Sequence, residues 1–186
     1  MNILITGVGG QGNIVLSRII SQIEMNRGNK VKTAENIGMS QRGGSVVSFI
    51  RINEDGGPII PNNSADVCLS LELIEGIRNI NKLHYKTKIA VNNKIIYSNL
   101  TSPFNQTFDG NWFKSNFEFV WIYNLNDLLT ENKMEKAENI ALLSFACKDR
   151  ILNYSLYEIK KAICEVLPPK IIEKNINLVE KIYNTI

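Results

Sequence analysis

The sequence has little cysteine, and what it has is not clustered. Cys68, Cys147 and Cys164 are the only cysteines, and they lie 79 and 17 positions apart. Iron–sulfur and zinc sites usually draw on closely spaced cysteine pairs, and an odd number without short spacings does not favour a disulfide framework. We therefore expect three small buried side chains and no metal site held by this chain alone.

Histidine is scarcer still, since His84 is the only one. It lies between Leu83 and Tyr85, near the predicted end of a helix, where a histidine is more often a surface residue than a general base. With one histidine in this position, the sequence offers no Ser/His/Asp or Cys/His set for nucleophilic catalysis. We therefore predict no catalytic residue in this chain.

Long apolar runs and clustered positive charge are also missing. Nothing approaches the roughly 20 apolar residues of a membrane-spanning helix, and the opening run Asn2–Thr6 is too short for the core of a secretory signal. The net charge is only +3, without the Lys/Arg face that nucleic-acid binding requires. These absences predict a cytoplasmic protein that binds neither a membrane nor nucleic acid.

What the sequence does contain is an alternation of short apolar runs with segments of helical periodicity. The runs predict strands at 2–6, 30–35, 45–52, 67–71, 89–91 and 118–123. Helical spacing predicts helices at 14–23 with a stop at Gly28, and at 72–83, 137–151, 155–166 and 169–183. Ser155 and Glu158 have the spacing of a capping box. Residues 36–44 and 53–66 are predicted loops, and 99–116 is predicted to be irregular.

This order of elements predicts the fold class. Strands interleaved with helices favour an α/β fold, a three-layer Rossmann-like sandwich, and direct strand–loop–strand connections make its sheet mixed. From about residue 126 the predicted elements are all helices. We find no internal repeat and no linker, so residues 1–186 are expected to form one domain.

The first motif is a glycine-rich turn between the first strand and the first helix. Its residues are Gly7, Val8, Gly9, Gly10, Gln11 and Gly12, with Gly7, Gly9 and Gly12 in the pattern G-x-G-x-x-G. Such glycines let a ligand approach the backbone, and the helix N-terminus offers free N–H groups to an anion. Glu35, at the end of the second predicted strand, lies where a nicotinamide-binding protein places its ribose-binding acid. Taken alone, the motif would support a dinucleotide site.

Two features weigh against a dinucleotide. Residues 36–44 hold three glycines and run directly into the strand 45–52, where a dinucleotide fold has a second crossover helix. The turn also has an extra glycine, Gly10, and a glutamine, Gln11, at its apex. That composition fits a rigid loop that contacts a phosphate-bearing ligand or the backbone of a partner. A strand–helix turn that binds no ligand is a further alternative.

The second motif surrounds Arg42. The run after Glu35-Asn36-Ile37 is Gly38-Met39-Ser40-Gln41-Arg42-Gly43-Gly44. Glycines on both sides would let the backbone project the guanidinium, whose planar fork of donors suits a carboxylate or a phosphate. Alternatively, Arg42 pairs with Glu35 and pins the loop, and the two interpretations are compatible because a pinned loop is preorganised.

Together, and in this order, the two motifs resemble one family, the small subunit of indolepyruvate-type 2-oxoacid:ferredoxin oxidoreductases. That subunit is equivalent to the gamma subunit or domain of pyruvate and ketoisovalerate oxidoreductases. A third match follows at Gly57–Pro61, Ala65–Val67 and Leu71–Glu75, and ends at Arg78. The resemblance covers about residues 2–93 and returns at Asn139–Leu143. The chain departs from it at Leu143-Ser144, where relatives have Leu-Gly, and at Ile95–Ser98, which replaces a proline-containing turn.

The resemblance implies a role inside a complex. Such enzymes decarboxylate a 2-oxoacid oxidatively with coenzyme A and pass the electrons to ferredoxin, using thiamine diphosphate and [4Fe–4S] clusters. Those cofactors belong to a companion subunit. This chain is therefore expected to bind none of them by itself, to be inactive alone and to meet ferredoxin only indirectly. The expected substrate is indolepyruvate or a similar 2-oxoacid, and a homodimer is compatible with the resemblance.

The resemblance also implies a place for the two glycine-containing loops, at the coenzyme A end of the active site or at the interface with the companion. The candidate residues are Gly7, Gly9, Gly10, Gln11, Gly12, Glu35, Gly38, Ser40, Gln41, Arg42, Gly43 and Gly44. Residues 99–116 are expected near the same interface. Two alternatives stay open: a stand-alone nucleotide- or coenzyme A-binding Rossmann-like protein, and an NAD-dependent enzyme.

Overall fold

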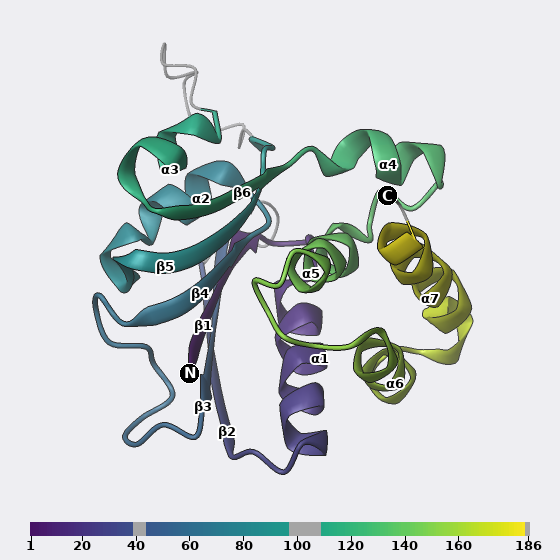
Figure 1. The fold of residues 1–186 in the computed structure, drawn as a ribbon, viewed down its shortest axis with the longest axis horizontal. Coiled ribbons are helices and arrows are strands. Elements are labelled where there is room, and N and C mark those ends of the chain that lie inside the picture. Colours follow the sequence, from purple (N-terminus) through teal and green to yellow (C-terminus); the bar gives the residue numbers. More distant parts are fainter. Residues whose placement is uncertain (39–43, 97–108, 185–186) are drawn as a thin grey trace.

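The computed structural model describes residues 1–38, 44–96 and 109–184 of the chain. Over these residues, six strands form one sheet in the order β2-β3-β1-β4-β5-β6 (Figure 1). The strands are β1 (Asn2–Val8), β2 (Val31–Ile37), β3 (Ser45–Ile52), β4 (Ala65–Ser70), β5 (Leu83–Asn92) and β6 (Phe119–Tyr123). The helices are α1 (Asn13–Asn26), α2 (Leu73–Arg78), α3 (Asn111–Asn116), α4 (Leu125–Glu131), α5 (Glu138–Lys148), α6 (Leu156–Val166) and α7 (Pro169–Asn184), with a 3₁₀ turn η1 (Ile80–Lys82).

The sheet is mixed, as the sequence predicts. β2, β3 and β1 pair antiparallel, whereas β1, β4, β5 and β6 pair parallel. Only residues 38–44 separate β2 from β3, which is too few for the crossover that a parallel pair needs. Ile5 of β1 therefore has an antiparallel neighbour, Ser48, on one side and a parallel neighbour, Leu69, on the other.

Helices cover both faces of this sheet. α2 and α3 lie on one face, α1 and α5 lie on the other, and α6 and α7 pack outside α1 and α5 (Figure 1). The expected three-layer α/β arrangement is confirmed.

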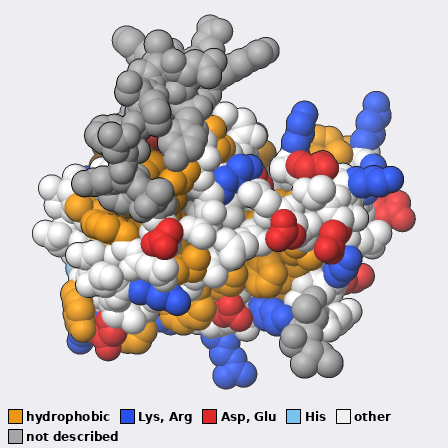
Figure 2. Space-filling model, turned by 90° about the horizontal axis from the view of Figure 1, so that it is seen from above, with side chains coloured by type: hydrophobic (Ala, Val, Ile, Leu, Met, Phe, Trp, Pro, Cys, Tyr) orange, Lys and Arg blue, Asp and Glu red, His pale blue; other side chains and the backbone are white. Residues whose placement is uncertain are grey.

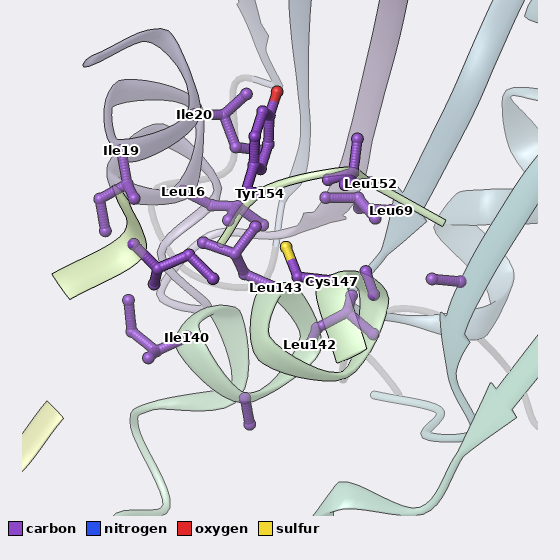
Figure 3. Close-up of a cluster of buried hydrophobic side chains, with 14 of the residues drawn as sticks. Leu16, Ile19, Ile20, Leu69, Ile140, Leu142, Leu143, Cys147, Leu152 and Tyr154 are labelled. Atoms are coloured by element: carbon purple, nitrogen blue, oxygen red, sulfur yellow. The ribbon is translucent and has the colours of Figure 1, made fainter. Parts of the chain in front are cut away.

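The larger core lies between the sheet and the pair α1 and α5. Ile19 and Ile20 of α1, Leu69 of β4 and Leu142 and Leu143 of α5 converge there with no exposed surface (Figure 3). The apolar face of the helix predicted at 14–23 forms one wall of this core. Burial of such side chains contributes about 1.5–3 kcal/mol each, so this packing fixes the position of α1 and the turn before it.

Several predicted elements agree closely with the structure. The strand 45–52 is β3 itself, and the capping box at the start of α6 forms, with Ser155 Oγ accepting from Glu158 N and the Glu158 carboxylate accepting from Ser155 N. Gly28 follows α1 with φ at 82°, a left-handed conformation that suits glycine and ends the helix.

The region around His84 differs from the prediction. The helix predicted at 72–83 ends at Arg78, and β5 begins at Leu83 instead of Ile89, so His84 lies on a strand and not at a helix end. The reason is Thr87, whose buried hydroxyl donates to Ala65 O at 2.7 Å and accepts from His84 N at 2.9 Å. These bonds hold the polar start of the strand in the sheet.

Two further predictions need correction. Residues 99–108 of the segment predicted to be irregular lie outside the described residues, but its end is α3, anchored by the fully buried Phe113. Of the three cysteines expected to be buried, Cys68 and Cys147 are, whereas Cys164 is exposed on α6.

Candidate functional site

The glycine-rich turn connects the end of β1 to the start of α1, at the edge where the parallel strands have their carboxyl ends. Gly10 and Gly12 have φ of 104° and 82°, in the left-handed region that favours glycine. Gly12 is the N-cap of α1 and brings no side-chain cap, and the first turn of α1 carries no acidic residue. The first N–H groups of a helix have no intrahelical partner and attract anions, so this end of α1 suits a negatively charged group.

Gln11 folds inward from the apex of the turn. Its Oε1 accepts from Val8 N at 2.9 Å, and its Nε2 donates to Leu71 O at 2.9 Å and to a Glu138 carboxylate oxygen at 2.7 Å. The side chain therefore ties the turn to the end of β4 and to the start of α5. It supports the turn from beneath, and its amide is fully used within the chain.

The glycines at the two ends of the turn are needed for close packing. A Cβ on Gly7 would lie 2.8 Å from both Gln11 Oε1 and Asn13 Oδ1, and one on Gly12 would lie 2.5 Å from Asn139 Nδ2. Asn139 donates to Gly12 O at 3.2 Å, and Asn13 donates to Val46 O at 2.9 Å. Nothing lies within 4 Å of the position that a Gly10 Cβ would take, so the apex of the turn is open.

A cavity of about 330 Å³ lies against this open apex. The turn supplies one wall through Gly9, Gly10 and Gln11. The rest comes from the segment after β5, through Lys94 and Ile96, and from the residues leading into α5, through Glu135, Lys136 and Glu138. Lys94 pairs with Glu138, the carboxylate that also accepts from Gln11. Lys136 forms no ion pair within the described residues, so a cation is available beside the helix N-terminus.

A second hollow, of about 450 Å³, shares Lys136 with the lining of the first. Its lining is mostly apolar, with Val15, Ile140 and Leu167 among the contributors, and Lys133 and Lys174 also line it. The two hollows together offer apolar walls and cationic side chains on either side of the turn. This combination suits an anionic ligand that also has an apolar part.

The loop that contains Arg42 begins and ends beside the turn. Gly9 N donates to Gly44 O at 2.8 Å, and Gly38 N donates to Ser45 O at 2.8 Å, which closes the base of the loop onto β3. The structure thus brings Gly38 and Gly44 together with the glycine-rich turn. Ser40, Gln41, Arg42 and Gly43 lie outside the described residues.

Glu35 is placed apart from the turn. It lies on the edge strand β2, and β3 separates β2 from β1. Its side chain lines a different hollow, beside Arg18 of α1. A ribose-binding acid would stand on the strand next to β1, so the dinucleotide arrangement considered from the sequence is not formed here.

Two buried carboxylates of the third motif hold the neighbouring segments in place. Glu72 caps α2 by accepting from Glu75 N at 2.7 Å, and it also accepts from Ile96 N at 3.1 Å. Burial raises the pKa of Glu72. Glu75 accepts from Ser45 Oγ at 2.5 Å and from Arg78 at 2.7 Å. These residues therefore support the cavity wall at Ile96 and the base of the Arg42 loop.

Lys94, Lys136 and Glu138 were not anticipated from the sequence. They lie more than 80 positions from the turn in the sequence and in no recognisable motif. The packing of α5 on α1 brings Lys136 and Glu138 to the turn, and Lys94 reaches it from the end of β5. A signal could have come from Asn139–Leu143, the part of the family resemblance that returns late in the chain and begins beside Glu138.

The described residues were also searched for a basic surface, a metal site and a membrane-spanning helix. On the face shown in Figure 2, Lys and Arg side chains alternate with Asp, Glu and hydrophobic side chains. No group of three or more His, Cys, Asp or Glu side chains among the described residues could hold a metal ion. In the same part of the chain, no helix is both long and apolar enough to cross a membrane.

Comparisons with known proteins agree with this geometry. The model of the family described as pyruvate ferredoxin/flavodoxin oxidoreductase matches residues 2–185. The indolepyruvate oxidoreductase subunit IorB of Archaeoglobus fulgidus is 30% identical over 190 residues, which cover 99% of this chain and 94% of that protein. The protein of the same name from Methanothermobacter thermautotrophicus is 42% identical over 104 residues, 56% of this chain and 50% of that one.

Solved structures share the fold at low sequence identity. The pyruvate oxidoreductase subunit PORC of Thermotoga maritima has a TM-score of 0.69 at 16% identity, over 98% of this chain and 94% of that one. The 2-oxoglutarate:ferredoxin oxidoreductase of Magnetococcus marinus has a TM-score of 0.71 at 17% identity, over 98% of this chain but only 30% of that longer one. The family identified from the two glycine motifs is confirmed, and the homologues are subunits of indolepyruvate and other 2-oxoacid oxidoreductases. The chain belongs to the pyruvate ferredoxin/flavodoxin oxidoreductase family.

Proposed function

We propose that this chain is the non-catalytic subunit of an indolepyruvate-type 2-oxoacid:ferredoxin oxidoreductase, and that its glycine-rich turn helps to hold coenzyme A. The observation that carries the proposal is the cavity at the open apex of the turn. There, the backbone of the turn at Gly9 and Gly10, which leads directly into the N-terminus of α1, and the cation Lys136 line the same space. Both are groups that bind phosphate.

Coenzyme A fits the chemistry of these residues. It has phosphate groups, which suit the helix N-terminus and the lysines, and a long, less polar arm, which suits the apolar second hollow. Gly10 would allow close approach because no atom lies within 4 Å of its missing side chain. Gly9 and Gly12 shape the same turn. We propose Arg42 as a further positioning group for the same ligand, because its loop begins and ends beside the turn.

The reacting cofactors belong, in this proposal, to a companion chain. Thiamine diphosphate would supply the carbon chemistry and [4Fe–4S] clusters the electron transfer. Support comes from the names of the relatives, which are subunits, and from the Magnetococcus marinus enzyme, in which this fold accounts for 30% of a longer chain. We further propose that the chain acts in the cytoplasm and meets ferredoxin only through its companion.

Titration of coenzyme A into the complex of this chain with its companion tests the role of the turn. Lys136→Gln should weaken coenzyme A binding about tenfold, equivalent to about 1.4 kcal/mol, because it removes the cation beside the helix N-terminus. Lys170→Gln, at an exposed position of α7 outside both hollows, is the matched control and should bind as the wild type does. Equal binding by both variants would contradict the assignment, and NAD binding in place of coenzyme A would favour the nucleotide alternative.

A further inference from the structure

The cavity at the glycine-rich turn is lined by negative as well as positive charge. Four charged side chains line it, namely Lys94, Lys136, Glu135 and Glu138. The second hollow differs, because the described residues that line it include Lys133, Lys136 and Lys174 and no Asp or Glu. The site proposed for a phosphate-bearing ligand therefore has carboxylates in one of its two hollows, the one at the turn.

Glu138 is the carboxylate that acts most strongly on this cavity. Its side chain is only 6% exposed, whereas Glu135 is an exposed residue whose charge is screened by water. Glu138 accepts from the Gln11 amide at 2.7 Å and pairs with Lys94, whose side chain is 29% exposed. Because a buried charge is screened much less than an exposed one, Glu138 is a fixed negative charge beside the space that the ligand would occupy.

The position of Glu138 in α5 draws several positive groups to the same carboxylate. Glu138 is the first residue of α5, and the N-cap Ala137 makes no side-chain cap bond. The start of a helix attracts a negative charge. The beginning of α5, the ammonium group of Lys94 and the amide of Gln11 therefore all act on Glu138. The same kinds of group attract a phosphate, and here a carboxylate of the chain itself neutralises them.

Bracing the turn does not by itself require a negative charge at this position. The bond from Gln11 needs an acceptor, and an amide oxygen accepts as a carboxylate oxygen does. A buried carboxylate destabilises a fold unless it is paired, and Glu138 is paired with Lys94. What the charge adds is repulsion of any anion in the cavity and compensation of Lys94. The charge of Glu138 therefore bears on ligand binding.

We propose that the Lys94–Glu138 pair lowers the affinity of the turn cavity for its anionic ligand, and that Glu138 sets this affinity. The inference rests on the proposed function, which assigns coenzyme A to this cavity. In that reaction coenzyme A leaves as an acyl thioester after each turnover. Binding that is equally strong for substrate and product slows release without speeding the chemical step. A cavity that holds its phosphate group weakly releases the product.

Titration of coenzyme A, and separately of inorganic pyrophosphate, into the complex of this chain with its companion tests the proposal. Glu138→Gln keeps an acceptor for Gln11 and frees the charge of Lys94, so it should bind both probes at least about fivefold more tightly. Lys94→Gln should bind them more weakly than the wild type. Glu180→Gln is the matched control, because it breaks the Lys160–Glu180 pair outside both hollows with the same change in net charge, and it should bind as the wild type does.

A double variant, Lys94→Gln/Glu138→Gln, separates an electrostatic role from a structural one. It should bind both probes more tightly than Lys94→Gln and more weakly than Glu138→Gln, and this order keeps the test decisive if Glu138→Gln does not fold. In Glu138→Gln the affinity should fall more steeply with ionic strength than in the wild type, and both KM for coenzyme A and kcat should be lower. Weaker binding by all three variants would mean that the pair only braces the turn, and would overturn the proposal.

The outcomes also separate this inference from the proposed function. Equal binding of coenzyme A by the wild type and the three variants would overturn the inference and leave the coenzyme A site in place. Pyrophosphate binding in the expected order, without coenzyme A binding by the wild type, would overturn the coenzyme A assignment alone. No binding of either probe by the wild type would overturn both.

Discussion

The side-chain amide of Gln11 donates to the carboxylate of Glu138 at 2.7 Å, and so joins the apex of the glycine-rich turn to the first residue of α5. The same carboxylate pairs with Lys94, after β5. Three segments far apart in the sequence are therefore fixed around one cavity before any ligand arrives. The side chain of Gln11 thus supports the site from within the chain, and a contact of Gln11 with a ligand stays a prediction.

Gln11→Ala should destabilise the isolated chain by about 2–3 kcal/mol. The change removes the acceptor for Val8 N and the donors to Leu71 O and Glu138, and it leaves buried polar groups unsatisfied. Urea unfolding measures the difference. Gln22→Ala, on a half-buried part of α1 where the amide bonds only to Asn26, should stay within about 0.5 kcal/mol of wild type. Equal costs for the two variants would refute the bracing role.

Gly12→Ala should lower the free energy of unfolding by about 3 kcal/mol, and Gly10→Ala should lower it by about 1 kcal/mol. Both glycines have positive φ, which strains any other residue, but only a Gly12 Cβ would also collide with Asn139, at 2.5 Å. Thermal or urea unfolding of the two variants provides the comparison. A larger cost at Gly10 would mean that the apex is packed and not open.

Glu158→Gln should lose about 1 kcal/mol of stability near neutral pH. The hydrogen bond from Arg27, at 2.6 Å, and the bonds from Ser155 lower the pKa of Glu158 from 4.5 to about 2. A lowered pKa in the folded state gives stability that is present above pH 4.5 and is lost as the pH falls toward 2. The difference in free energy of unfolding between the wild type and Glu158→Gln should therefore become smaller as the pH falls from 4.5 toward 2. Glu173→Gln, at an exposed position of α7, is the control and should stay within about 0.5 kcal/mol of the wild type in stability.

One cysteine should react quickly in the native protein. Burial raises the pKa of Cys68 and of Cys147 to about 12, and both are inaccessible, whereas Cys164 is exposed. A thiol reagent at pH 8 should label one site in native protein and three in denaturant, and Cys164→Ser should abolish the fast native phase. Fast labelling of two or more sites would show that the core around Cys147 opens readily.

The sequence predicts the fold well because its signals are local. The β-branched run of β3, the apolar face of α1 and the Ser155–Glu158 capping box each lie within a few residues, and each appears as expected. The start of β5 was missed because a single buried contact, from Thr87 to Ala65 O, holds polar residues in the sheet. That contact spans 22 positions and leaves no periodic pattern.

The sequence predicts the part of the candidate site that a local motif encodes, and it misses the part that depends on tertiary packing. Gly10 and Gly12 are visible as a motif, because their backbone conformation demands glycine. Lys136 and Glu138 are ordinary charged residues, and only tertiary packing assigns them to the site. The inward direction of Gln11 likewise depends on Leu71 and Glu138, which no local pattern reveals.

We propose that this chain works only as one part of a larger enzyme. The most direct test of this proposal is turnover of indolepyruvate with coenzyme A and ferredoxin, measured for the purified chain, for its thiamine- and cluster-bearing companion, and for the two co-expressed. We expect no turnover by this chain alone, co-elution of the two proteins, and full activity only in the complex. Full activity from this chain alone would mean that it is not a dependent subunit.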